Sequence, residues 1–175
     1  MQVVSDTSPV LNLAIIGRLE LLLEQFGKIL IPSAVLAELR SGENLPGSQA
    51  IREALESGWI EIREAKDAVL IQVLQRELDK GEAEAVALAL QLKANWTILD
   101  EREARRVAKC LGLDVTGTLG ILARAKLTGR ISSLYTTMVE LREKAGFRIG
   151  EELFAKFVRS VGEDLESISS SEPQD

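Results

Sequence analysis

The chain of 175 residues contains no histidine and a single cysteine, Cys110. Without histidine, serine and cysteine hydrolases that need a His general base are excluded, and so are zinc sites built on two His ligands. A lone cysteine excludes disulfide scaffolds, cysteine zinc clusters and CxxC redox motifs. Cys110 itself is expected to be a small residue of the core. Carboxylate oxygens remain as the main ligand type that the chain offers.

Long apolar runs are also absent. No run reaches the roughly 18 residues of a membrane span, and the N-terminus lacks the basic region and apolar segment of a signal peptide. We therefore expect a cytoplasmic protein without a membrane partner. The apolar fraction of 46% is ordinary for a globular protein, and the length is enough for one domain with a sizeable core.

Basic residues are fewer than acidic ones, 21 against 27, which gives a net charge of −6. This balance argues against strong, non-specific binding of nucleic acid. Three arginines nevertheless cluster just after Asp100: Arg102, Arg105 and Arg106. A solvated helix face is the ordinary interpretation of such a cluster, and contact with phosphate groups is the functional one, which a nuclease would use for RNA.

Short apolar segments that are typical of strands alternate with segments of helical spacing. Strands are predicted at about 2–5, 29–31, 59–62, 96–99 and 113–115. Helices are predicted at about 9–15, 19–26, 33–40, 51–57, 68–78, 81–94, 101–111, 119–127, 131–145 and 150–161. This alternation predicts an α/β protein with three layers, α/β/α, around a central, mostly parallel sheet of four to five strands.

Two acidic residues, Asp6 and Asp100, directly follow predicted strands. Ligands of parallel sheets bind beyond the carboxyl ends of the strands, so we expect both side chains at one edge. Mg²⁺ and Mn²⁺ prefer such hard oxygen ligands. Asp6 is not needed as a helix cap, because Ser8 is expected to cap and Pro9 suits the first helical position. Asp100 has capping-box spacing to Glu103, a role that is compatible with metal binding.

Glu38 and Glu82 lie on predicted helices. Glu38 occupies a partly apolar face, and a solvated helix residue is an equally good interpretation. Glu82 lies on the same helix face as Val86 and should point inward, whereas Glu84 is expected on a more solvent-exposed face. The alternative for Glu82 is purely structural, since Asp79 and Glu82 also have capping-box spacing.

Further polar side chains near the expected sheet edge are candidates for accessory roles. Glu101 and Glu103 are reserve metal ligands. Four hydroxyl groups could donate hydrogen bonds to a water or a phosphate, although such residues more often cap helices: Thr7, Ser8, Thr116 and Thr118.

Five segments, read together, resemble the PIN-domain ribonucleases, in particular a prokaryotic branch related to the VapC-like toxins of toxin–antitoxin pairs. The segments are Val4–Pro9, Ile31–Val35 with Glu38, Gly81–Ala85, Leu99–Arg102 and Leu113–Gly120. The resemblance covers roughly residues 2–130.

The resemblance implies a metal-dependent endoribonuclease that hydrolyses single-stranded RNA with Mg²⁺ or Mn²⁺. It implies that Asp6, Glu38, Glu82 and Asp100 are the catalytic acids, and that Asp6, Glu82 and Asp100 bind the metal. The third acid of the family is commonly Asp, so the longer Glu82 departs from the pattern. The family often adds an acid just after the last of these, a position open here to Glu101 or Glu103.

The same resemblance predicts the organisation and the partners of the chain. Residues 1–130 would form the nuclease core and residues 131–165 a helical extension of the same domain. The Ser-, Glu- and Pro-containing composition of the C-terminus predicts a disordered tail at residues 166–175. A homodimer and a small antitoxin protein are the expected partners, with the chain as the toxin of a type II toxin–antitoxin pair.

Two other functions compete with the nuclease. A catalytically silent module of the same fold, for protein interaction or RNA binding, would use the acids only as caps and solvated groups. A response-regulator phosphoacceptor domain needs an acidic pair after the first strand and a lysine after the last one. It is disfavoured, because Asp6 precedes Thr7-Ser8 and Val115 precedes Thr116-Gly117.

Overall fold

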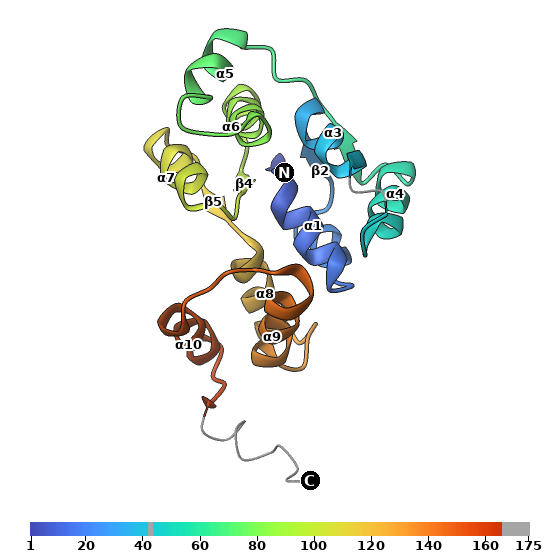
Figure 1. Ribbon diagram of the computed structural model, residues 1–175, viewed down its shortest axis with the longest axis vertical. Coiled ribbons are helices and arrows are strands. Elements are labelled where there is room, and N and C mark those ends of the chain that lie inside the picture. Colours follow the sequence, from blue (N-terminus) through green and yellow to red (C-terminus); the bar gives the residue numbers. More distant parts are fainter. Residues whose placement is uncertain (42–43, 166–175) are drawn as a thin grey trace. The chain divides into compact units, whose positions relative to one another are not determined.

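Within the described residues, 1–41 and 44–165, five strands form one sheet in which all neighbours are parallel (Figure 1). This computed structural model confirms the expected three-layer α/β/α fold. The order across the sheet is β3-β2-β1-β4-β5. The strands are β1 (Val3–Ser5), β2 (Ile29–Ile31), β3 (Ile60–Ile62), β4 (Trp96–Ile98) and β5 (Val115–Thr116).

The helices connect successive strands and then continue beyond the last one. They are α1 (Thr7–Ile15), α2 (Glu20–Phe26), α3 (Ser33–Ser41), α4 (Ser48–Glu56), α5 (Ala68–Leu74), α6 (Lys80–Leu92), α7 (Arg102–Cys110), α8 (Thr118–Leu127), α9 (Leu134–Ala145) and α10 (Glu151–Ser160). Most bounds agree with the sequence patterns within two or three residues. The predicted tail, 166–175, lies outside the described residues.

Three elements differ from the sequence-based expectation. Helix α1 begins at Thr7, because Asp6 has the extended backbone of an N-cap, so Ser8 lies inside the first turn and does not cap it. Strand β5 is displaced toward 115–116, where the Thr97 and Leu99 amides donate to the carbonyls of Asp114 and Thr116. Helix α5 ends early, since 75–77 form tighter turns.

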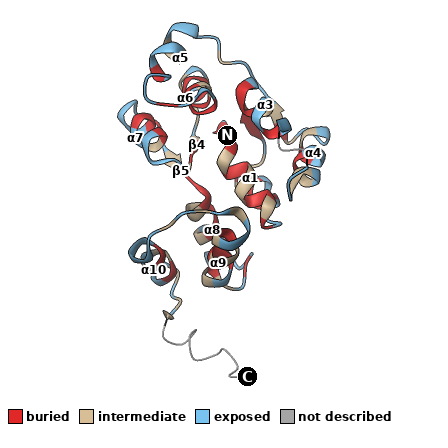
Figure 2. Ribbon diagram, in the orientation of Figure 1, coloured by how far each residue is buried: buried red, intermediate tan, exposed pale blue. Residues whose placement is uncertain are grey.

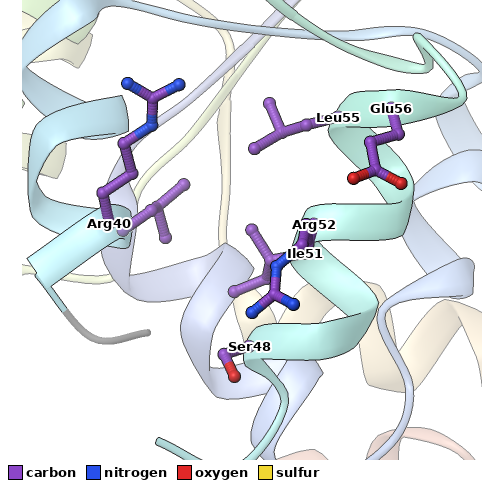
Figure 3. A pocket seen from close by; sticks show the side chains of 7 residues that line it. Arg40, Ser48, Ile51, Arg52, Leu55 and Glu56 are labelled. Carbon is purple, nitrogen blue, oxygen red and sulfur yellow. The ribbon is translucent and has the colours of Figure 1, made fainter. Parts of the chain in front are cut away.

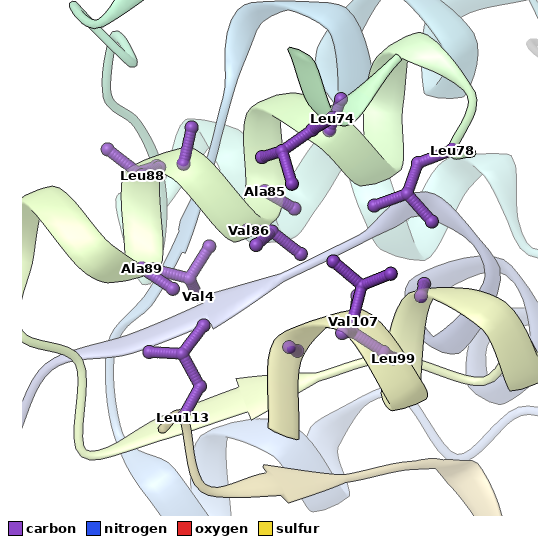
Figure 4. Packing of buried hydrophobic residues seen from close by; sticks show 14 of the residues in the cluster. Val4, Leu74, Leu78, Ala85, Val86, Leu88, Ala89, Leu99, Val107 and Leu113 are labelled. Carbon is purple, nitrogen blue, oxygen red and sulfur yellow. The ribbon is translucent and has the colours of Figure 1, made fainter. Parts of the chain in front are cut away.

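One face of the sheet is covered by α6 and α7, whose apolar side chains pack on the strands (Figure 4). Val4 and Leu30 point to this face, and Val3 is buried on the opposite one, as strand alternation requires. Helix α6 contributes mainly small residues such as Ala85 and Ala89, which let it lie close to the sheet. Figure 2 shows the buried residues along the inner faces of these helices.

The prediction that Cys110 belongs to the core is wrong. The buried stripe of α7 consists of Ala104, Val107 and Ala108. Cys110 is the last residue of the helix, lies outside that stripe and is exposed. Among the helices in the described ranges, none has the length and apolar character needed to cross a membrane.

The chain divides into two compact units, Met1–Thr118 and Leu119–Asp175. The first contains the whole sheet. In the second, the carboxylate of Glu163 accepts hydrogen bonds from the amides of Leu134 (2.6 Å) and Tyr135 (2.9 Å), and so caps α9. Lys126 forms an ion pair with the same carboxylate at 3.3 Å. One side chain therefore joins residues of α8, the start of α9 and the segment after α10.

Candidate active site

Asp6 and Asp100 follow two adjacent strands, β1 and β4. Ser5 is paired with Ile98, and the Asp6 amide donates to the Ile98 carbonyl at 3.1 Å. The strand order reverses direction between β1 and β4, and such a switch point is where parallel α/β sheets bind ligands. The register therefore places both residues at the edge of the sheet that favours a ligand site.

The carboxyl group of Asp6 is buried, with 4% of the residue exposed. Its Oδ1 has no hydrogen-bond partner within the described part of the chain. Burial, above all, raises the pKa of Asp6 to about 7, against the opposing hydrogen bond of the Thr7 amide. The carboxylates of Asp79, Glu82 and Glu38 raise this pKa further. Such an oxygen is suited to a cation, which would satisfy it and offset the repulsion.

Glu82 lies in the first turn of α6 and is 7% exposed. Its carboxylate accepts a hydrogen bond from the Asp79 amide at 3.0 Å, and Asp79 accepts one from the Glu82 amide at 2.8 Å. The predicted capping box is therefore confirmed. Burial is the main reason that the pKa of Glu82 is raised; the Asp79 amide opposes the shift, and the charges of Asp79, Glu101 and Glu38 add to it.

Asp79 is thus a fifth acid beside the candidate site, since its charge raises the pKa of both Asp6 and Glu82. The sequence analysis gave it only the role of a helix cap. Its position, three residues before Glu82, was the signal that could have placed it at the site.

Glu38 is exposed on α3 but is held at the site by two neighbours. The hydroxyl of Thr7 donates to Glu38 Oε2 at 2.5 Å. On α6, a Cβ atom at Gly81 would lie 2.6 Å from Glu38 Oε1 and 3.2 Å from Asp6 Oδ1. Glycine at 81 therefore leaves the space into which both carboxylates reach.

Asp100 has a different environment from the other three acids. Its Oδ1 accepts from the Thr118 amide at 2.7 Å, and its Oδ2 accepts from the Thr118 hydroxyl at 2.6 Å and from Asn12 Nδ2 at 2.9 Å. Burial raises the pKa of Asp100, while these donors and the charge of Arg105 oppose the rise. The contact of Asn12 with Asp100 was not predicted, although Asn12 is the one amide side chain in the apolar run of α1.

The expected capping box of Asp100 and Glu103 is wrong. The N-cap of α7 is Glu101, whose side chain makes no capping hydrogen bond. The carboxylate of Asp100 is instead engaged by Thr118 and Asn12. Glu103 forms an ion pair with Arg106 at 2.9 Å.

The three arginines after Asp100 differ in how far they are already engaged. Arg105 donates to the Leu99 carbonyl at 2.7 Å, beside Asp100. Arg106 is paired with both Glu77 and Glu103. Arg102 is exposed in the first turn of α7. Of the accessory hydroxyl residues, Ser8 and Thr116 are half-buried, and Thr7 and Thr118 are buried.

The donor set is chemically suited to a hard divalent cation, because it consists of carboxylates around a buried oxygen without a partner. Across the described residues, however, no three acidic side chains are already arranged to hold an ion. Binding an ion would therefore require a rearrangement of these acidic side chains.

A separate cavity of about 260 Å³ lies between α3 and α4 (Figure 3). Its walls are formed mainly by Leu39, Ile51 and Leu55, with Arg40 and Arg52 beside them. It shares no residue with the acidic group. The acids, which carry groups able to bind a cation and activate water, remain the candidate active site.

The family model of the PIN domain matches residues 2–163. The chain therefore belongs to the PIN-domain family, whose members are generally nucleases and generally use divalent metal ions. The match includes α9 and α10 and so extends past residue 130, where the resemblance noted in the sequence was thought to end. A search of curated proteins gave no match.

Proposed function

We propose that the protein is a metal-dependent endoribonuclease that hydrolyses phosphodiester bonds of single-stranded RNA, with Mg²⁺ or Mn²⁺ as the cofactor. One observation carries the proposal. In a PIN-domain fold, the buried Asp6 has an oxygen that finds no hydrogen-bond partner among the described residues, and it lies among Glu38, Glu82 and Asp79. Without a cation, this accumulation of carboxylates is electrostatically unfavourable.

In this proposal, Asp6, Glu82 and Asp100 would hold the cation, which would supply Lewis-acid polarisation of a phosphoryl oxygen and of water. Glu38, held by Thr7, would contact the cation through its bound water, orient that water for attack and accept its proton. The water oxygen would bond to phosphorus as the bond from phosphorus to the departing sugar oxygen breaks, and that sugar oxygen would take up a proton from solvent water. Thr118 and Asn12 keep the Asp100 carboxylate in place throughout. Arg102 is exposed and lies two residues after Asp100, so it is the arginine that we expect to contact an RNA phosphate.

The direct test is cleavage of single-stranded RNA with Mn²⁺ by the wild type and by Asp6→Asn. Removal of the charge should reduce cleavage by about 100-fold or more, as expected for a group on which metal binding depends. Asp67→Asn is the matched control, because Asp67 is an exposed carboxylate that caps α5 and Asn can also cap. Equal cleavage by the wild type and Asp6→Asn would reject the nuclease assignment.

A catalytically silent module of the same fold is the second candidate. The observation in its favour is that the Asp100 carboxylate is already engaged by Thr118 and Asn12. Thermal unfolding with and without Mn²⁺ separates the two functions. A nuclease that binds the ion gains melting temperature, because only the folded state has the site, whereas a silent module gains none.

We further propose that the enzyme is the cytoplasmic toxin of a type II toxin–antitoxin pair and belongs to the VapC-like branch. The support is the resemblance of the five segments described above. A small protein encoded beside it should co-purify with it and block cleavage. Normal growth on induction without that neighbour would instead favour a role in RNA processing.

A homodimer is also proposed. Its support is an apolar stripe on α5, where Val69 and Val73 lie one turn apart and are 73% and 56% exposed. Light scattering coupled to size exclusion should give twice the chain mass. A mass of one chain would contradict the proposal.

A further inference from the structure

Glu84, on α6, caps a different helix from its own. Its Oε2 accepts a hydrogen bond from the Ala34 amide at 2.9 Å, across 50 residues of sequence. Ala34 lies in the first turn of α3, where backbone N–H groups have no partner within the helix. A carboxylate there is also favoured by the positive end of the helix dipole.

The contact belongs to a pair that joins α3 and α6. On α3, Ala34 and Glu38 are four residues apart and therefore on the same face. On α6, Gly81 and Glu84 are three residues apart and also share a face. Glu84 contacts Ala34, and Gly81 leaves the space occupied by the Glu38 carboxylate. Helices α3 and α6 thus meet at two points, one turn apart, and Glu38 lies at one of them.

The residues at the two contacts are small, Gly81 and Ala34, so the side chain of Glu84 supplies a directional contact that they do not. A hydrogen bond to one particular amide has a defined length and direction, and it fixes the position of α3 along α6. From the sequence, Glu84 was expected only to point toward solvent beside Glu82.

We propose that Glu84 is a positioning residue for the acidic site: by capping α3 it holds Glu38 against Gly81 and beside Asp6. The inference rests on the proposed metal-dependent function. Glu84 does not touch the ion or the RNA in this proposal. It acts through the backbone of α3, so its loss should weaken metal binding while the fold remains.

The experiment measures Mn²⁺ binding to the full chain without RNA, by electron paramagnetic resonance of the free ion. Glu84→Met keeps the side-chain volume but removes the acceptor, and should weaken Mn²⁺ binding about 10-fold, in the range found for groups that orient metal ligands. Glu84→Gln keeps an acceptor oxygen and should bind nearly as the wild type does. Glu84→Ala serves as a second variant if Glu84→Met does not fold.

Asp67→Ala is the control for the loss of a cap as such, because Asp67 accepts the Leu70 amide at the start of α5. It should lower the melting temperature and leave Mn²⁺ affinity unchanged. The positioning role of Glu84 would be overturned if Glu84→Met bound Mn²⁺ as tightly as the wild type, or if Glu84→Gln lost as much Mn²⁺ affinity as Glu84→Met. Either result would leave the proposed nuclease function intact. If the wild type binds no Mn²⁺, the proposed function fails and this inference fails with it.

Discussion

Two carboxylates, Asp6 in the sheet unit and Glu163 in the C-terminal unit, show opposite ways of holding an acid away from solvent. Glu163 accepts hydrogen bonds from the amides of Leu134 and Tyr135, and it forms an ion pair with Lys126. Burial alone would raise the pKa of Glu163, but these donors outweigh it and lower the pKa. In the described part of the chain, one oxygen of Asp6 has no hydrogen-bond partner, and burial, with the acidic neighbours adding to it, raises the pKa of Asp6 to about 7.

The difference indicates which acid serves stability and which is suited to function. An acid with donors on both oxygens stabilises the fold wherever it is ionised. An acid that lacks them lowers stability when it is ionised, unless something from outside the chain neutralises it. The carboxylate of Asp6 fits the second description, and the following experiments test the contrast.

The largest effect on stability should come from Asp6 in metal-free protein. Its pKa is raised from an ordinary 3.8 to about 7, so its stabilising, protonated form is fully present below about pH 4 and is lost as the pH rises through 7. The free energy of unfolding should therefore fall by about 4 kcal/mol from this group between pH 4 and pH 8. Urea denaturation with a chelator measures this change.

Asp6→Asn should remove most of that fall, because Asn carries no charge at either pH. Added Mn²⁺ should stabilise the wild type more at pH 8 than at pH 5, because Asp6 is ionised at pH 8 and can then bind the ion. If the free energy of unfolding of the wild type and of Asp6→Asn changed with pH in the same way, ionisation of Asp6 would not be the cause of the loss of stability.

The second effect concerns Glu163 and has the opposite sign. Glu163→Ala leaves the amides at the start of α9 without their acceptor and should lower stability by about 2 kcal/mol at pH 7. Because the pKa of Glu163 is lowered, this stabilisation is present above its ordinary value of 4.5 and is lost as the pH falls through the lowered value. Hydrogen exchange of the α9 amides reports the loss, with the exposed Glu143→Ala as the control.

Two glycines beside the acids should respond differently to an added methyl group. A Cβ at Gly117 would lie 2.8 Å from the Leu99 carbonyl oxygen, which is backbone and cannot turn away. Gly117→Ala should therefore lower the free energy of unfolding by about 1–3 kcal/mol. At Gly81 the nearest atom belongs to the flexible side chain of Glu38.

Gly81→Ala should accordingly fold about as well as the wild type, since Ala restricts the unfolded chain more than Gly does and the Glu38 side chain can move aside. Its methyl group would displace Glu38, so metal-dependent cleavage should fall about 10-fold. Chemical denaturation and RNA cleavage of both variants separate the two cases. Full activity of Gly81→Ala would show that Glu38 does not need this position.

The smallest effect is expected at Cys110. Because its side chain is exposed at the end of α7, Cys110→Ser should change stability by no more than about 0.5 kcal/mol. A loss of more than 1 kcal/mol in thermal unfolding would restore the core role that the sequence suggested.

Strands and acids were predictable from local patterns. The apolar run Ile29–Ile31 and the segment before Asp100 are short enough to exclude helices, and each matches a strand. The capping box of Asp79 and Glu82 followed from spacing alone. Asn12 and Glu84 could not be assigned partners in this way, because their contacts join residues 88 and 50 positions apart.

The amino-acid order by itself determined the alternation of strands and helices and the membership of the PIN family. It also determined that the potential metal ligands after the strands are carboxylate oxygens, since the chain has no histidine. These properties depend on side-chain chemistry and on short-range periodicity. The tertiary structure decided which acids receive hydrogen-bond donors and which do not, since that depends on helices that meet only after folding. Asp6 and Asp100 are the same residue type after neighbouring strands, yet Thr118 and Asn12 satisfy only the second.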